Sequence, residues 1–192
     1  MGDEPVVRPL FGGAMSMTVP ARFMDISMVR QVPNNQEVFA DASTDQSFII
    51  EILELPPDAP DAEAARFHFD VIASEGGALS TEVETETQQR VVMGDNNVQR
   101  TVMWGLQQVG KHRDRADRAN SVRVHVACFR AHNVSADIVV SFNSPVFISE
   151  QSAVAPNVDA QRMAHYNAPE QALAVFTQAI DTLQINDWSL FG

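Results

Sequence analysis

A regular alternation of apolar and polar side chains marks the second half of this chain. Two sets alternate across residues 121–131, with Val122, Val124, Val126 and Cys128 on one side and Arg123, His125 and Phe129 on the other. Successive side chains of a β-strand point to opposite faces, so this pattern predicts a strand with one buried face. Residues 101–109 and 136–142 are predicted to be strands beside it. Consecutive strands joined by turns pair most simply as antiparallel neighbours.

The other segments divide into separate strands and helices. Further strands are predicted at residues 14–19, 36–40 and 47–55, although Glu51 and Glu54 leave a helix possible in the last. Helices are predicted at residues 60–74, capped by Asp58, and at residues 167–183, opened by a capping box from Asn167 to Glu170. Residues 149–166 are predicted to be a long loop. Because strands and helices do not alternate strictly, the chain is expected to fold as an α+β layered domain.

The net charge indicates which partners the protein can bind, and the cysteine content and apolar runs exclude two structural classes. The formal net charge is −12, with 25 acidic and 13 basic residues. Such a surface repels nucleic acid and anionic lipid, which bind proteins through Lys and Arg, and it favours a basic protein partner. The single cysteine, Cys128, excludes an internal disulfide framework. No apolar run reaches membrane-spanning length, and residues 1–7 are expected to form a flexible acidic tail.

The sequence carries little recognisable catalytic chemistry. Residues 105–112 match a phosphate-binding loop except at the last position, where His112 replaces the Ser or Thr that ligates magnesium. The charged segment that follows has no apolar stripe, so we interpret this match as a strand and a solvated turn. Cys128 lies on the valine-rich side of its strand and is expected to be a buried structural thiol. The histidines show no paired spacing, so neither a metal site nor a cofactor is predicted.

Five segments of the first quarter carry a family resemblance: residues 9–14 (PLFGGA), 26–33 (ISMVRQVP), 35–39 (NQEVF), 45–47 (DQS) and 49–55 (IIEILEL). In this order and spacing they resemble the Ran guanine nucleotide release factors, the Mog family. Fainter similarity returns at residues 136–145 and 189–192. The resemblance implies one domain over residues 1–192, similar to PsbP-like proteins. Its expected core is a central antiparallel sheet of about six strands flanked by α-helices on both faces.

The same resemblance implies a function and a binding surface. Members of this family bind the small GTPase Ran and promote release of its guanine nucleotide in nuclear import, so the protein is expected to be a monomeric regulator in nucleus and cytoplasm, and not an enzyme. The positions that match the family's Ran-contacting surface are Asp25, Asn34, Asn35, Gln36 and Glu37. Asn34 stands where an aspartate is common in relatives, so one charge of the surface is missing.

The roles of Asp25 and Glu37 and the function of the protein each have an alternative interpretation. Asp25 is also expected to cap a helical turn, and Glu37 to be a solvated carboxylate at a strand end. The fold is equally compatible with an adaptor that binds Ran or a trafficking partner without releasing nucleotide. A small hydrolase or ligand carrier would need a pocket between sheet and helix, lined by a nucleophile, a base and an orienting acid.

Overall fold

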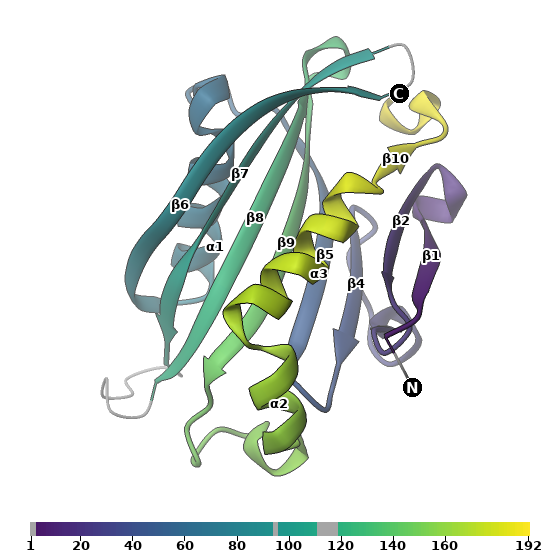
Figure 1. Cartoon of the computed structure of the whole chain (residues 1–192). Coiled ribbons are helices and arrows are strands. Elements are labelled where there is room, and N and C mark those ends of the chain that lie inside the picture. The colour runs from purple at the N-terminus through teal and green to yellow at the C-terminus, as the bar shows by residue number, and fades with distance from the viewer. Residues whose placement is uncertain (1–2, 94–95, 111–118) are drawn as a thin grey trace.

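The alternating segments of the second half form the long antiparallel ladder at the centre of the molecule (Figure 1). In this computed structural model, residues 3–93, 96–110 and 119–192 are described. Seven strands form one sheet, in the order β3 (Met24–Asp25), β4 (Gln36–Asp41), β5 (Gln46–Glu54), β9 (Ala136–Phe147), β8 (Asn120–Ala131), β7 (Asn96–Val109) and β6 (Ala78–Met93). All six neighbouring pairs are antiparallel. The strands predicted at residues 36–40, 47–55, 101–109, 121–131 and 136–142 are thereby confirmed.

A second sheet lies against this one. It contains β1 (Pro5–Leu10), β2 (Met15–Pro20) and β10 (Gln184–Ile185), and β2 is its central strand. The strand predicted at residues 14–19 is confirmed as β2. The predicted flexible tail is too long, because residues 5–7 belong to β1 and pair with residues of β2; residues 1–2 of that tail lie outside the described part of the chain.

The described part of the chain also contains three α-helices: α1 (Ala64–Glu75), α2 (Ala160–Tyr166) and α3 (Pro169–Asp181). Helix α1 packs on the side of the large sheet that carries Val124, Val126 and Cys128. Helix α3 packs on the opposite side, together with β2 of the small sheet. His125 points to this side and is fully buried beneath Phe176 of α3. It therefore belongs to a helix-covered face and not to a polar surface.

The predicted fold, a central sheet of about six strands flanked by α-helices on both faces, is wrong. The described chain contains ten strands in two sheets, and the layer opposite α1 is shared between the three-stranded sheet and α3. The error arises because residues 5–7 are predicted to belong to a tail and residues 8–10 to no element. In the structure these residues form β1 of a second sheet, and that sheet covers the far side of β4, β5 and β9.

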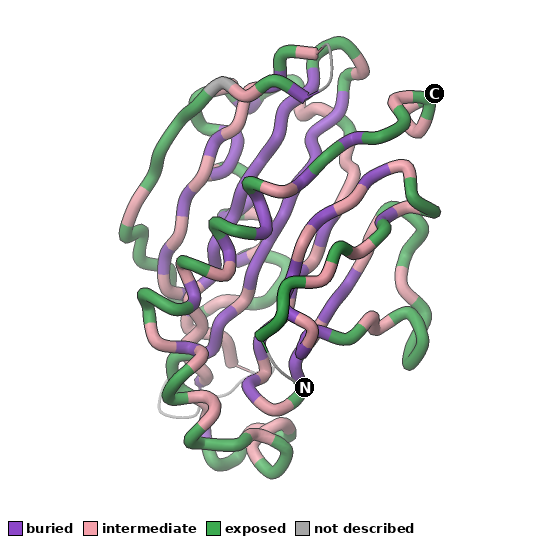
Figure 2. The backbone as a smooth tube through the Cα atoms, turned by 45° about the vertical axis from the view of Figure 1, so that its right-hand side comes forward, coloured by how far each residue is buried: buried purple, intermediate pink, exposed green. Residues whose placement is uncertain are grey.

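The two sides of the large sheet carry two separate apolar cores. The larger lies between the sheets and α3 and includes Phe23, Phe48, Phe142 and Phe176, and the smaller lies under α1. Figure 2 shows that the central strands are buried along most of their length, whereas the outer connections are exposed. Strands with both sides covered read as continuous apolar runs. In β9, residues 136–142 are all buried and are mostly apolar, with Asp137 and Ser141 as the polar exceptions.

Short 3-10 turns connect several elements: η1 (Phe11–Gly13), η2 (Ile26–Met28), η3 (Asp61–Glu63), η5 (His132–Val134), η6 (Ala155–Asn157) and η7 (Trp188–Phe191). Two predicted caps are wrong. Pro60, and not Asp58, is the N-cap of η3, which leads directly into α1. The predicted capping box is also absent, because the Asn167 side chain donates to the backbone oxygens of Thr44 and Pro145 and α3 begins at Pro169.

Two other predictions concern segments of low regularity. The loop predicted at residues 149–166 contains helix α2, whose N-cap Asp159 accepts bonds from the backbone N–H groups of Gln161 and Arg162. The apparent phosphate-binding loop begins inside β7, which continues to Val109. Its Lys111 and His112 lie outside the described residues.

Within the described residues, every helix is too short or too polar to cross a lipid bilayer.

Candidate partner-binding surface

Asp25 organises the turn at one edge of the large sheet. It ends β3 and is the N-cap of η2, where its Oδ1 accepts a hydrogen bond from the backbone N–H of Ser27 at 2.8 Å. A carboxylate in this position satisfies a backbone donor that the first helical turn leaves unpaired. The predicted capping role of Asp25 is confirmed. Its side chain is half-buried, so part of the carboxylate still faces solvent.

Glu37 joins the two sheets. It lies on β4, and its Oε1 accepts a hydrogen bond from the backbone N–H of Phe11 at 2.6 Å. Phe11 begins the η1 turn after β1 with a φ of 49°, and Gly12 and Gly13 follow with positive φ. A bulky residue in the left-handed region is uncommon, so the carboxylate stabilises a turn that the backbone alone disfavours. Glu37 therefore has a structural role and is more than a solvated carboxylate.

Asp25 and Glu37 lie on the same side of the sheet edge. Asp25 pairs with Phe39 across β3 and β4, and Glu37 is two residues from Phe39 along β4. Residues two apart on a strand point to the same face, and diagonal neighbours across a pair are about 7–8 Å apart. Both side chains are half-buried. The fold thus brings together two carboxylates that are twelve positions apart in the sequence.

Of the other three predicted residues, Asn34 and Asn35 lie in the turn that enters β4, and Gln36 is the first residue of β4. Asn34 and Asn35 are exposed, and Gln36 is half-buried. Asn35 Nδ2 donates to the backbone oxygen of Ile52 at 3.3 Å, and Gln36 Nε2 donates to Glu51 Oε1. These two amides tie the turn to β5, so contact with a partner would require exchange of an existing hydrogen bond.

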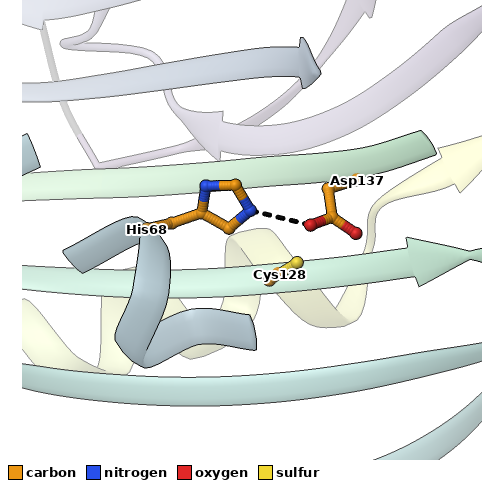
Figure 3. A group of neighbouring side chains, drawn as sticks. All are labelled: His68, Cys128 and Asp137. Atoms are coloured by element: carbon orange, nitrogen blue, oxygen red, sulfur yellow. Dashed lines mark hydrogen bonds and ion pairs between the residues drawn. The ribbon is translucent and has the colours of Figure 1, made fainter. Parts of the chain in front are cut away.

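A group of polar and titratable side chains is buried beneath α1. His68 of α1, Cys128 of β8 and Asp137 of β9 meet there, and His68 Nε2 lies 2.8 Å from Asp137 Oδ2 (Figure 3). Arg130 Nε and Nη2 donate to the two oxygens of Asp137, each at 2.8 Å. Arg130 Nη1 also donates to the backbone oxygen of Ala59 at 2.6 Å. The network fastens α1 and the segment before it to the centre of the sheet.

The electrostatics of this group oppose nucleophilic and metal chemistry. Burial raises the pKa of the Cys128 thiol well above its usual value, and the neighbouring Asp137 raises it further. Burial alone would raise the pKa of Asp137, but hydrogen bonds from Arg130 and His68 outweigh it and lower the pKa to about 2. The three ligand atoms lie within 4.8 Å of one another, but a cation there would compete with the Arg130 guanidinium for both oxygens of Asp137. The group is therefore a structural network.

A small open pocket of about 190 Å³ lies at the outer end of the same network. Its lining residues are Asp61, Asn97, Val98, Gln99 and His132. Asp61 Oδ2 lies 2.8 Å from His132 Nε2, and Asp61 Oδ1 is 3.2 Å from Arg130 Nη1. This lining supplies an acid and a base but no Ser, Thr or Cys nucleophile. The pocket does not provide the constellation that the hydrolase alternative requires.

The buried network is not among the features predicted from the sequence, although the sequence contains a signal for it. Asp137 and Arg130 lie within the most apolar strands of the chain, and both are fully buried. A charged side chain inside an apolar strand needs a charged or hydrogen-bonding partner. That rule predicts a partner for each residue, but it does not say which one, since the pairing depends on the register between β8 and β9.

The residues of the sheet edge lie within a segment that matches a known family. The model of the family described as "Ran-interacting Mog1 protein" matches residues 8–145. The chain belongs to this family. The resemblance found in the first quarter is thereby confirmed, and the match includes Phe11, Asp25 and Glu37, together with both partners of the Arg130–Asp137 ion pair.

Individual proteins agree with this assignment. A Danio rerio protein named Ran guanine nucleotide release factor is 37% identical over 190 residues, covering 96% of this chain and 99% of that protein. A Saccharomyces cerevisiae protein named nuclear import protein MOG1 is 29% identical over 195 residues, covering 95% and 83%. The crystal structure of the Saccharomyces cerevisiae Ran-binding protein Mog1p is similar in fold, with a TM-score of 0.74, 23% identity and coverage of 98% and 99%.

Proposed function

We propose that this protein binds the small GTPase Ran, promotes release of its bound guanine nucleotide and thereby regulates nuclear protein import. The match over nearly its whole length to a Danio rerio protein named Ran guanine nucleotide release factor carries this proposal. A relative named as a nuclear import protein supports the transport role. In this proposal the chain acts as a single monomeric domain in nucleus and cytoplasm. It regulates a GTPase and makes or breaks no covalent bond itself.

The binding surface in this proposal is the sheet edge that carries Asp25 and Glu37. The net charge of −12 favours a basic partner surface over nucleic acid or membrane, because opposite charge accelerates encounter and like charge slows it. Asp25 and Glu37 are held on one side of β3 and β4 by their own backbone hydrogen bonds. A partner therefore meets two carboxylates in a fixed arrangement, which reduces the entropy lost on binding.

Nucleotide release follows if this surface binds one state of Ran better than another. A GTPase holds its nucleotide through a phosphate-binding loop, a lysine and magnesium. A partner that prefers the nucleotide-free state shifts the equilibrium by its difference in affinity. Carboxylates contribute in two ways, by pairing with basic groups that otherwise hold phosphate and by repelling the phosphates. Asn34, Asn35 and Gln36 supply neutral hydrogen bonds beside them.

The test is the release rate of a fluorescent guanine nucleotide from Ran. Asp25→Asn with Glu37→Gln removes both charges, while Asn still caps a helical turn and Gln still offers an oxygen to Phe11. We expect this double variant to accelerate release less than the wild-type protein at unchanged melting temperature. The matched control removes two exposed acids elsewhere, with Asp58→Asn and Glu75→Gln. Wild-type release rates in the double variant would exclude the two charges from the mechanism.

The same assay distinguishes the adaptor alternative. If the wild-type protein binds Ran in a pull-down but leaves nucleotide release at its basal rate, the protein is an adaptor on this fold. Ran loaded with GDP, loaded with GTP and stripped of nucleotide should be compared in the pull-down, because a release factor must prefer one of these states.

A further inference from the structure

Two adjacent apolar side chains project from the turn beside Asp25. Met28 is 86% exposed and Val29 is 80% exposed, and Met24 of β3 is 50% exposed. Isolated exposed apolar residues are common on protein surfaces. Three within six positions, two of them almost entirely in solvent, form a local apolar projection, which is the kind of feature that marks interaction sites.

The backbone holds this projection in place. Asp25 caps η2, and the N–H groups of Val29 and Arg30 both donate to the backbone oxygen of Ile26, at 2.9 and 3.0 Å. The turn also packs against β4. Met28 and Val29 are thus carried on an ordered turn. Apolar side chains on an ordered turn lose less conformational entropy on binding than side chains on a mobile loop.

The surroundings of the projection are polar and carry two acidic groups close in sequence, together with the exposed Arg30 that directly follows Val29. Asp25 directly precedes η2, and β4, on which η2 packs, carries Gln36 and Glu37. Glu51 follows on β5, where Gln36 is bonded to it. An apolar centre with a polar rim is the usual anatomy of a specific protein–protein interface. Asp25 and Glu37 outnumber Arg30 in this rim, so its net negative charge favours a partner whose own rim is mainly basic.

We propose that Met28 and Val29 are the apolar anchors of the Ran-binding surface, filling an apolar depression on Ran that basic side chains surround. This inference rests on the proposed function and assigns a different task to each part of the surface. The carboxylates accelerate encounter, since their field acts at a distance and is screened by salt. Burial of Met28 and Val29 slows dissociation, since apolar contacts form only in the docked complex.

The experiment measures association and dissociation rates with nucleotide-free Ran immobilised on a sensor surface. Met28→Ser with Val29→Ser should raise the dissociation rate by about tenfold or more, as expected for buried interface anchors. The association rate and its salt dependence should stay near wild type. Met28→Gln, which preserves side-chain length, should give a smaller effect in the same direction. The control is Val92→Ser on β6, at the opposite edge of the large sheet, where Val92 is 71% exposed.

The possible results separate the inference from the proposed function. If the wild-type protein does not bind Ran in any nucleotide state, the proposed function fails and the anchor assignment fails with it. If the wild-type protein binds and the double serine variant binds equally tightly, only the anchor assignment is overturned. Analytical ultracentrifugation of the protein alone tests whether a second copy of this chain covers the projection instead. If the wild-type protein is a dimer and the double serine variant is a monomer, the projection is a dimer contact and the proposal is overturned.

Discussion

Glu37 Oε1 accepts a hydrogen bond from the backbone N–H of Phe11 at 2.6 Å, and this contact joins the edge of the large sheet to the turn of the small one. The same side chain is a predicted contact for Ran. One carboxylate therefore maintains the geometry of the surface and contributes to its charge. Substitutions that remove only the charge, or both the charge and the hydrogen bond, are needed to distinguish these two roles of Glu37.

Glu37→Ala should destabilise the protein, whereas Glu37→Gln should not. Alanine leaves the Phe11 N–H without its partner, which costs about 1–3 kcal/mol for a buried donor and less where water reaches it. Glutamine keeps an oxygen at the same place. Urea denaturation followed by circular dichroism measures the difference. Equal stability of the two variants would show that the hydrogen bond contributes little to holding the η1 turn.

Breaking the buried Arg130–Asp137 ion pair should lower the free energy of unfolding more than breaking an exposed ion pair does. Asp137→Asn leaves the Arg130 guanidinium fully buried beside a neutral amide. Removal of one member of a buried pair typically costs about 3–5 kcal/mol. The control is Arg66→Ala, which breaks an exposed pair with Asp70 on α1 and should cost at most about 0.5 kcal/mol. If Asp137→Asn lowers the free energy of unfolding no more than Arg66→Ala does, the structural role assigned to the Arg130–Asp137 pair is contradicted.

His125 should make stability depend on pH in a defined window. Burial lowers its pKa from 6.5 to about 4. Because the unfolded chain binds the proton more readily, stability is complete above pH 6.5 and falls as the pH is lowered toward 4. The slope approaches about 1.4 kcal/mol per pH unit inside that window.

His125→Phe should flatten this part of the profile, because the neighbours of the ring include Trp104, Phe142 and Phe176. The measurement is the free energy of unfolding in urea at pH values from 4 to 7. Substitution of the exposed His165 by alanine should leave the profile unchanged. A wild-type slope that persists in His125→Phe would assign the pH dependence to other groups.

Asn34→Asp should strengthen binding to Ran. The residue is exposed at the turn before β4, so the new carboxylate costs little desolvation and adds a third charge beside Asp25 and Glu37. We expect the association rate to rise by about twofold to fivefold at low ionic strength, and the gain to shrink as salt screens it. An unchanged association rate at low salt would place Asn34 outside the contact surface.

Five strands of the large sheet (β4, β5, β7, β8 and β9) could be predicted because their patterns are local, whereas β3 and β6 lack such a pattern and were not predicted. In β8 the alternation of residues 121–131 reflects two faces with different surroundings, one under α1 and one under α3. Helix α3, which lies within the predicted range 167–183, also carries a local pattern, because its buried side chains recur at helical spacing. The predicted capping box at the start of that helix is wrong, because the Asn167 side chain instead donates hydrogen bonds to the backbone oxygens of Thr44 and Pro145. Both residues are more than twenty positions away in the sequence.

The small sheet and the buried network could not be predicted in the same way. Residues 5–10 become a strand because β2 is present to pair with them, and the apolar side of β2 packs under α3. His68, Arg130 and Asp137 come together through the packing of α1 and the register between β8 and β9. Both features depend on contacts between distant segments, which no local pattern contains.

The amino-acid sequence by itself determined the strand periodicity, the acidic charge, the capping role of Asp25 and the membership in the Ran-interacting family, because each of these depends on residue type and spacing. Only the tertiary structure decided that Asp25 and Glu37 share one side of a sheet edge and that Met28 and Val29 project beside them. The reason is physical: strand pairing and sheet packing set which side chains are covered, and coverage determines which groups remain for a partner to contact.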